Sequence, residues 1–237
     1  MYESSSLKSK ISSQLLYGEK FKILYKKKQF IKIKTDYDNY TGYIKLSKFI
    51  NKFRETHKVK VLKSRILKNP NYLRKSKTKK FLPFSSNIEV IKKKKKFVMF
   101  EKNKWLNSKD IKPIDQKDQN ILKILKLFLN CKYTWGGKTF NGIDCSALIQ
   151  LFYKFNNNFF PRDTVDQIKF KKGVKRKVKF KLGDIIYWKG HVAVCINSKE
   201  LIHAYGPRKK VLIMPIKKTI KLIKETANLE VKKIFLI

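Results

Sequence analysis

The spacing of apolar residues changes once along this chain of 237 residues, and that change constrains the fold more than any other feature. Up to about residue 114, apolar and polar residues alternate in short runs, which is the period of a half-buried β-strand. From Gln119 to Asn130 the apolar residues recur at helical spacing and form a wide apolar face. We therefore predict a strand-rich N-terminal part and a domain with both helices and strands over residues 115–237.

The strand-rich part divides into two segments of similar style. Residues 1–54 contain the alternating runs Phe21–Lys26 and Phe30–Thr35, and residues 55–114 contain four further short runs. About fifty residues of short strands are typical of a small barrel. The lysine run Lys92–Lys96 lies between two of these runs, where we expect a solvated hairpin tip.

The charge balance is extreme, with a formal net charge of +41. Such an excess attracts anions, whether nucleic acid, wall polymer or membrane. The lysines are nevertheless spread over the whole chain, and Lys, Ile, Asn and Phe all have A/T-rich codons, so genome composition is a sufficient explanation. We therefore expect no nucleic-acid partner. A hydrophobic content of 42% is enough to build cores, which indicates a globular protein.

The three cysteines, Cys131, Cys145 and Cys195, show neither paired spacing nor the Cys/His spacing of zinc sites. We therefore predict no disulfide framework, no metal and no cofactor. No apolar run reaches the length of a signal peptide or of a membrane span. We expect a monomer without a transmembrane segment, cytoplasmic by default, or periplasmic or wall-associated if a leader has been removed.

Cys145 stands where a helix is predicted to begin. Leu148, Leu151, Phe152 and Phe155 follow it at the spacing of one buried helical stripe. Asp144 is a plausible N-cap, and a helix start stabilises a thiolate through its free N–H groups and partial positive charge. A lone cysteine at such a place is more often part of a core, so a reactive role requires a nearby base.

The chain has three histidines, and two of them lie on predicted neighbouring strands. His57 opens the second segment, where we expect an incidental surface residue. His191 begins the strand "HVAVCI" on a face of small residues, and His203 lies in the next strand, twelve residues later. A three-residue loop centred on Asn197 would put the two rings directly opposite, and a five-residue loop would put them diagonal. An even-numbered loop would send His203 to the other face.

This arrangement predicts nucleophilic catalysis. His191 takes the thiol proton of Cys145 and pairs with the thiolate, while His203 orients the ring of His191. The thiolate attacks a carbonyl, and the resulting acyl-enzyme is hydrolysed. The backbone N–H of Cys145 and a neighbouring donor could hold the oxyanion, and Tyr133 could supply that donor or position the substrate.

The stretches "YTWGGKTFNGIDCSALIQLFYK", "FPRDTVDQ", "LGDIIYW…GHVAVCI" and "LIHAYG" resemble the NlpC/p60 family of cell-wall cysteine peptidases. The resemblance covers residues 118–210 and implies an α+β, papain-like catalytic domain. It places the nucleophile on Cys145, the base on His191, the third member of the triad on His203 and the family tyrosine on Tyr133. Ala147 stands where many members have Gly, which we expect to be a mild change.

Residues 10–50 resemble the bacterial SH3 domain that precedes the catalytic domain in dipeptidyl-peptidase VI-like members, and residues 57–113 look like a second, diverged SH3 domain. This implies two small SH3-like β-barrels, with domains at 1–54, 55–114 and 115–237. It also implies hydrolysis of the γ-D-glutamyl–diamino acid bond in murein peptides that have a free N-terminal L-Ala.

The same resemblance implies an acidic pocket for the substrate amine. The matching acid is Asp163, for which a helix N-cap is the competing interpretation. The other substrate-binding candidates are Ser146, beside the nucleophile, and Glu19 and Tyr40 in the first SH3-like segment. Two alternatives stay open: an exported endopeptidase that acts on intact peptidoglycan, and a catalytically silent wall-binding protein with two SH3 modules.

Overall fold

The structure is a computed structural model that describes residues 1–50, 52–70, 77–170, 172–175 and 179–236. The chain forms two compact units. The first unit comprises Met1–Asp118 with Phe155–Asn157, and the second comprises Gln119–Lys154 and Asn158–Ile237. The predicted division of the first 114 residues into two domains remains a prediction.

The first unit begins with a three-stranded antiparallel sheet in the order β1-β2-β3. Alternation in β2 produces its burial pattern, because Ile31 and Ile33 point into the core while Lys32 and Lys34 stay partly exposed. A register shift interrupts the pairing of β1 with β2 between Ile23 and Tyr25. The strands are β1 (Phe21–Lys27), β2 (Phe30–Thr35) and β3 (Thr41–Lys45).

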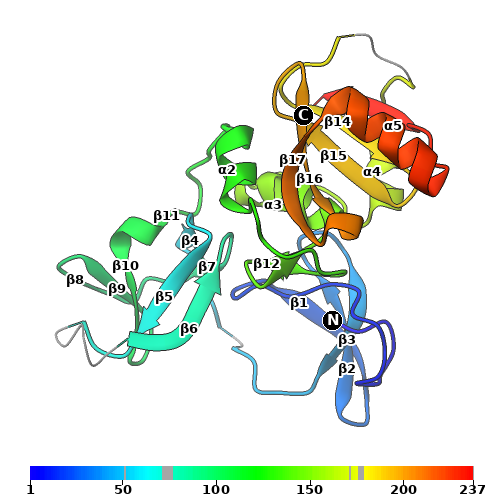
Figure 1. Ribbon diagram of the computed structural model, residues 1–237. Helices are drawn as coiled ribbons and strands as arrows, with labels where there is room; N and C mark the ends of the chain where they lie inside the picture. The colour runs from blue at the N-terminus through cyan, green and yellow to red at the C-terminus, as the bar shows by residue number, and fades with distance from the viewer. Residues whose placement is uncertain (51, 71–76, 171, 176–178, 237) are drawn as a thin grey trace. The chain divides into compact units, whose positions relative to one another are not determined.

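Two further sheets complete the first unit, in the orders β6-β5-β10-β9-β8 and β11-β4-β7 (Figure 1). Their shared core includes Val59, Leu82, Ile88 and Leu106. The elements are β4 (His57–Val59), β5 (Lys63–Leu67), β6 (Lys77–Pro83), β7 (Asn87–Ile88), β8 (Lys92–Lys94), β9 (Phe97–Glu101), β10 (Lys104–Asn107), the 3-10 helix η1 (Ser108–Asp110) and β11 (Ile111–Pro113).

The second unit is built on a five-stranded antiparallel sheet in the order β17-β16-β15-β14-β18. The strands are β14 (Asp184–Trp188), β15 (His191–Cys195), β16 (Glu200–Tyr205), β17 (Lys210–Pro215) and β18 (Lys233–Leu236). The 3-10 helix η2 (Gly206–Arg208) joins β16 to β17, and the short strands β12 (Lys138–Thr139) and β13 (Gly142–Ile143) pair with each other.

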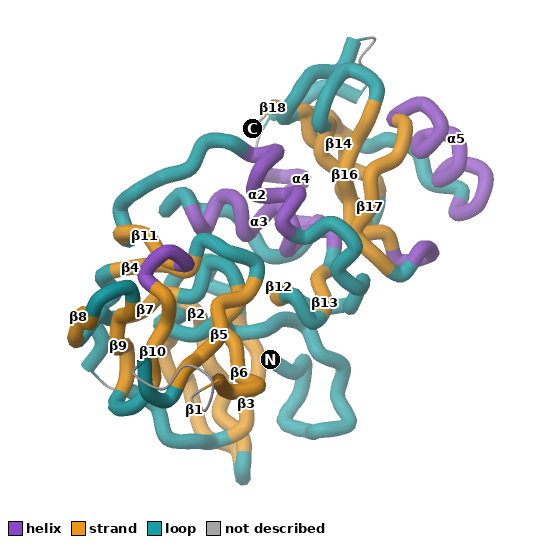
Figure 2. Tube along the Cα trace, turned by 60° about the vertical axis from the view of Figure 1, so that its left-hand side comes forward, coloured by secondary structure: helices purple, strands orange, loops and turns teal. Residues whose placement is uncertain are grey.

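Helices pack around this sheet. Figure 2 shows α2, α3 and α4 grouped together and separated from α5 by the sheet. Ile216 and Ile223 of α5 pack against Ala193, Cys195 and Leu201 of the sheet. The helices are α2 (Ile121–Leu127), α3 (Cys145–Phe155), α4 (Thr164–Phe170) and α5 (Ile216–Ala227). None of the described helices is long and apolar enough to cross a membrane.

Helix α3 follows the predicted stripe. Leu148, Leu151, Phe152 and Phe155 are all at most 3% exposed, so one whole face of the helix is buried. The helix begins at Cys145, one residue after Asp144. The nucleophile candidate therefore occupies the first position of a helix whose other turns are held in the core.

Candidate active site

A buried ion pair lies at the start of α3. Arg162 donates from Nη2 to Oδ2 of Asp144 at 2.6 Å and from Nη1 to Oδ1 at 3.1 Å, which is a bidentate geometry. The side chains are 1% and 8% exposed. Oδ1 of Asp144 also accepts from the N–H of Ala147 at 2.8 Å, so the predicted N-cap is confirmed.

Ser146 belongs to the same network. Its hydroxyl donates to Oδ1 of Asp144 at 3.0 Å and accepts from Nη1 of Arg162 at 2.8 Å. Gln167 of α4 donates from Nε2 to the carbonyl of Ser146 at 3.0 Å. The one proton of the hydroxyl is thus used inside the protein. This favours a structural role for Ser146, and its predicted contact with substrate stays a prediction.

The thiol of Cys145 is buried against the beginning of β15. Burial, followed by the charge of Asp144, raises its pKa to about 12, while backbone N–H groups of Val192 and Ser146 and the guanidinium of Arg162 act in the opposite direction. The sequence predicts a stabilised thiolate at this helix start, and that expectation is wrong for the protein without substrate. Desolvation outweighs the helix N-terminus, so Cys145 is held as a neutral thiol.

The two histidines share one face of the β15–β16 hairpin. Val194 pairs with Ile202 and Cys195 with Leu201, so the loop is centred on Ser198 instead of Asn197. Continuing this register puts His203 across from Ala193, diagonal to His191. The N–H of Ile196 donates to the carbonyl of Glu200, so residues 197–199 form a three-residue loop beyond the two strands. The shared face agrees with the prediction, and the loop centre at Ser198 makes the geometry diagonal. Nε2 of His191 lies 2.9 Å from Nδ1 of His203.

A third side chain determines which nitrogens carry protons. Nε2 of His203 lies 3.3 Å from Sδ of Met214, and a thioether can only accept. The proton of neutral His203 is therefore on Nε2, and its Nδ1 accepts from Nε2–H of His191. This leaves Nδ1 of His191 unprotonated and available as the base.

Burial keeps both rings neutral. It lowers the pKa of His191 to about 4. It also lowers the pKa of His203 to about 3, with the charge of His191 as a second cause. In the part of the chain that the structure describes, no hydrogen bond joins the thiol of Cys145 to the ring of His191. Catalytic hydrogen bonds of this kind often form only when substrate is bound.

Tyr133 lies near Cys145. Burial, followed by the charges of Cys145 and Asp144, raises the pKa of its hydroxyl far above the usual value, so the hydroxyl stays protonated and can donate. The backbone of Tyr133 donates to the carbonyl of Lys209 at 2.8 Å, which ties this residue to the β16–β17 connection. This environment fits the predicted role as a donor to the oxyanion or to the substrate.

The remaining substrate-binding candidates occupy different places. Asp163 directly precedes α4, and its carbonyl accepts from the N–H groups of Asp166 and Gln167. It is therefore at the N-cap position, and this is compatible with a second role for its carboxylate. Glu19 and Tyr40 are in the first unit, where Oε2 of Glu19 accepts from the N–H of Leu16 at 2.8 Å. Their contact with substrate stays a prediction.

The chemistry of the site follows from these groups. Among the residues placed by the structure, no group of three or more His, Cys, Asp or Glu side chains is arranged to hold a metal ion. The site instead has a thiol at a helix start, a neutral imidazole with a free nitrogen and a second imidazole that orients the first. Together with the fold, these side chains are the groups that nucleophilic catalysis by a thiol requires.

Comparison with known proteins shows which domain families two parts of the chain match. Residues 130–226 match the NlpC/P60 family, and residues 1–49 match the bacterial dipeptidyl-peptidase SH3 domain. The chain therefore contains an NlpC/P60 family domain, preceded by an SH3-type domain. The crystal structure of an NlpC/P60 family protein from Bacillus cereus has the same fold, with a TM-score of 0.73 and 21% identity over 86% of this chain and 77% of that one.

Curated relatives match at somewhat higher identity. The chain is 29% identical over 128 residues to gamma-D-glutamyl-L-lysine dipeptidyl-peptidase of Bacillus subtilis, a match that covers 49% of this chain and 43% of the relative. It is 32% identical over 89 residues to dipeptidyl-peptidase 6 of Lysinibacillus sphaericus, covering 36% of this chain and 32% of the relative. The matched region thus spans less than half the length of either relative.

Sequence reasoning missed two residues of the site. Arg162 stands in the "FPRD" stretch and gave no signal in its spacing, because the burial that makes Asp144 need a cationic partner is a property of the fold. Met214 gave no signal either, because a methionine in a strand is ordinarily a packing residue.

We predict that Arg162→Ala lowers the free energy of unfolding by about 3–5 kcal/mol, because it leaves the buried carboxylate of Asp144 without its partner. Chemical denaturation followed by circular dichroism would measure the change. Lys221→Ala is the matched control, since it removes an exposed i,i+4 pair with Glu225, and it should cost less than about 0.5 kcal/mol. Equal effects of the two variants would contradict the assignment.

The lowered pKa values also predict how stability depends on pH. The unfolded chain protonates its histidines near the ordinary pKa of about 6.5, whereas folded His191 and His203 protonate only at about 4 and about 3. The unfolded state therefore binds more protons in this window, and the free energy of unfolding should decrease as pH falls from about 6.5 to about 3. His203→Gln should show a shallower decrease than the wild type; parallel curves would contradict the buried neutral pair.

Proposed function

We propose that this protein is a cysteine peptidase that hydrolyses the γ-D-glutamyl–diamino acid bond of murein peptides with a free N-terminal L-Ala. One observation carries the proposal. His191 is hydrogen-bonded to His203 at 2.9 Å, and the thiol of Cys145 is buried against the beginning of β15, the strand that starts with His191. The relatives named for gamma-D-glutamyl-L-lysine dipeptidyl-peptidase activity support the choice of bond. The match of residues 1–49 to the SH3 domain of bacterial dipeptidyl-peptidases supports the same subfamily.

The reaction begins from a neutral pair. Nδ1 of His191 takes the proton from the Cys145 thiol as sulfur attacks the γ-carbonyl carbon of the D-glutamyl residue. The imidazolium so formed donates through Nε2–H to His203, and the tetrahedral oxyanion accepts from the N–H of Cys145 and from Tyr133. His191 then gives its proton to the leaving amine of the diamino acid, and the C–N bond breaks.

The second half of the reaction releases the dipeptide. Nδ1 of His191 takes a proton from water, the resulting hydroxide attacks the thioester, and the Cys145 sulfur leaves and regains its proton. Because burial raises the pKa of Cys145 and lowers that of His191, it disfavours a resting ion pair. Proton transfer therefore accompanies the attack instead of preceding it.

Asp163 is the group that we propose for recognition of the substrate amine. Its carboxylate would pair with the ammonium of the N-terminal L-Ala, and a blocked or extended N-terminus would lose that charge and that hydrogen bonding. The net charge of +41 supports an acidic substrate in a general way, because murein peptides carry several carboxylates.

We expect Cys145→Ala to abolish turnover of L-Ala-γ-D-Glu-diaminopimelate, with a loss of at least about a thousandfold, because the nucleophile is removed while the fold is kept. Mass spectrometry of the released dipeptide would measure the rate, and circular dichroism would check the fold. Cys131→Ala is the matched control, since it removes a cysteine to which the mechanism gives no role, and it should retain most of the activity. Similar rates for wild type and Cys145→Ala would refute the nucleophile.

The same assay tests the amine pocket. Wild type should release L-Ala-D-Glu from the free peptide and leave the N-acetylated peptide intact, and Asp163→Asn should raise KM for the free peptide by about tenfold or more. Cleavage of both peptides would keep the triad and favour the endopeptidase of intact peptidoglycan. Cleavage of neither by a folded sample would favour the silent wall-binding protein.

A further inference from the structure

A second chemically distinctive place lies in the first unit, on residues other than those of the candidate active site. Strand β4, the β8–β9 hairpin and the η1–β11 segment surround a hollow of about 330 Å³. Its polar lining consists of His57, Lys93, Lys95, Ser108 and Lys112. The proposed peptidase function assigns no role to any of these residues.

The sequence predicts the lysine run as a hairpin tip. In the structure its first three residues form strand β8 and Lys95 is in the turn. Lys92, Lys93 and Lys94 pair with Met99, Val98 and Phe97 of β9, so alternate lysines point to opposite faces. Lys93 and Lys95 line the hollow, whereas Lys92 and Lys94 do not. Lys95 is at the turn with a φ of 49°, so it ends the alternation beside the hollow.

The hollow is electrostatically one-sided. Its lining contains three lysines and a histidine and no Asp or Glu side chain. Burial and then the charge of Lys93 lower the pKa of His57, and the charge of Asp115 only partly opposes them. Cations that face one another with no acid among them repel, and a bound anion would relieve that repulsion.

Donors toward an anion are available. Nδ1 of His57 is hydrogen-bonded to the hydroxyl of Thr56 at 2.9 Å, which leaves Nε2 as the second ring position. The Lys112 ammonium donates to the carbonyl of Lys117 at 3.0 Å and lies over the ring of Phe155, so it contributes positive charge to the lining. The donors that the lining offers to an anion come chiefly from Lys93, Lys95 and the ring of His57. Several N–H donors converging from different strands suit an oxyanion with several acceptor oxygens.

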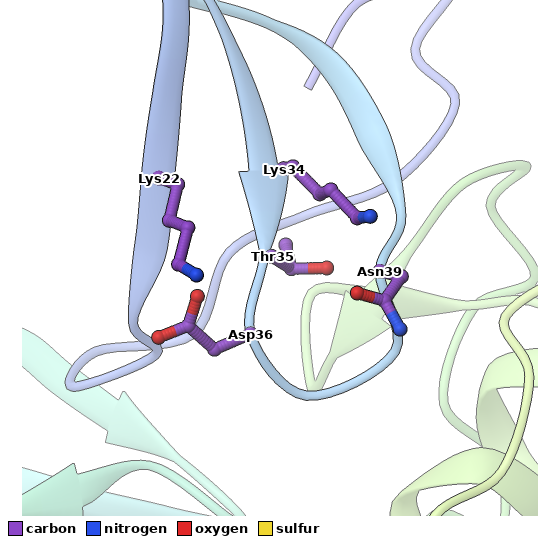
Figure 3. Close-up of a pocket in the computed structure, with 5 residues that line it drawn as sticks. All are labelled: Lys22, Lys34, Thr35, Asp36 and Asn39. Atoms are coloured by element: carbon purple, nitrogen blue, oxygen red, sulfur yellow. The ribbon is translucent and has the colours of Figure 1, made fainter.

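A comparison within the same unit shows what distinguishes this hollow. Figure 3 shows the pocket beside β1 and β2, where the carboxylate of Asp36 points toward the ammonium of Lys22 and the amide of Asn39 lies across from Lys34. That pocket already contains an acid for its lysines. The hollow around His57 does not, so it is the stronger candidate for an anionic ligand.

We propose that the hollow lined by His57, Lys93, Lys95, Ser108 and Lys112 binds the phosphate group of a sugar phosphate. A volume of about 330 Å³ exceeds what a lone phosphate fills and is near the lower end for small-molecule pockets. Ile111 and Pro113 supply an apolar wall for a sugar ring beside the charged group. The ligand is either a soluble sugar phosphate or one unit of a sugar-phosphate polymer.

The test uses the full chain and monitors the ring of His57 by NMR. Glucose 6-phosphate should produce a saturable shift and raise the pKa of His57, and glucose at the same concentration should not. A polymer of sugar phosphates that binds more tightly per phosphate than glucose 6-phosphate would identify the polymer as the source. Equal affinity per phosphate would identify the soluble form. Inorganic phosphate that binds as tightly as glucose 6-phosphate would overturn the sugar part of the proposal.

Two variants of equal charge decide whether the hollow is specific. Lys93→Gln should weaken glucose 6-phosphate binding by about tenfold or more, because it removes a charge-assisted donor from the lining. Lys94→Gln changes the same net charge on the opposite face of the same strand and should weaken binding by no more than about twofold. Equal weakening by both variants would mean diffuse attraction to a basic surface and would overturn the site. The site would also be overturned if duplex DNA bound more tightly than glucose 6-phosphate and its affinity were unchanged by Lys93→Gln. The assay needs no peptidase activity, so it can be repeated in Cys145→Ala.

Discussion

The bidentate pair between Asp144 and Arg162 is the interaction on which the candidate active site depends. It caps α3 at the position before Cys145, engages the hydroxyl of Ser146 and ties the segment before α4 to the start of α3. Both side chains are almost fully buried, so neither charge is tolerable without the other. The position of Cys145 is thus fixed by a charge pair as well as by the apolar stripe of α3. The pair determines where the start of α3 lies more than it adds to the net free energy of unfolding.

The same burial sets the resting chemistry. Removing the thiol and the two imidazoles from water disfavours each charged form, which raises the pKa of Cys145 and lowers those of His191 and His203. The thiol of Cys145 and the ring of His191 are therefore both neutral at rest. Met214 fixes the positions of the protons on the two neutral rings. Its sulfur can accept a hydrogen bond but cannot donate one, so the proton of His203 is on Nε2 and that of His191 is on the nitrogen facing His203.

Much of this could be predicted from the sequence because it depends on local periodicity. The stripe of α3, the N-cap at Asp144 and the common face of His191 and His203 all follow from spacing along one helix or one hairpin. The pairing of Arg162 with Asp144 could not be derived in this way, since it joins residues eighteen positions apart that are on no common element. The direction of the Cys145 pKa was mispredicted for a related reason: a helix start is visible in sequence, whereas the depth of burial is a property of the whole fold.

The distribution of acids gives the net charge of +41 a structural meaning. Several of the seventeen Asp and Glu residues are used to build the fold. Asp144 holds Arg162, Asp110 accepts from Ser64, and Oδ2 of Asp184 accepts from the backbone of Lys181. The charge of Asp144 is paired with Arg162, whereas hydrogen bonds from neutral groups leave the charges of Asp110 and Asp184 in place. The 58 Lys and Arg residues still far outnumber the 17 acids, so the field outside the protein remains positive even if the lysines themselves were fixed by codon usage. An anionic ligand approaching either unit meets that field first, and the arrangement of particular residues, such as Lys93 against Lys94, then decides where it binds.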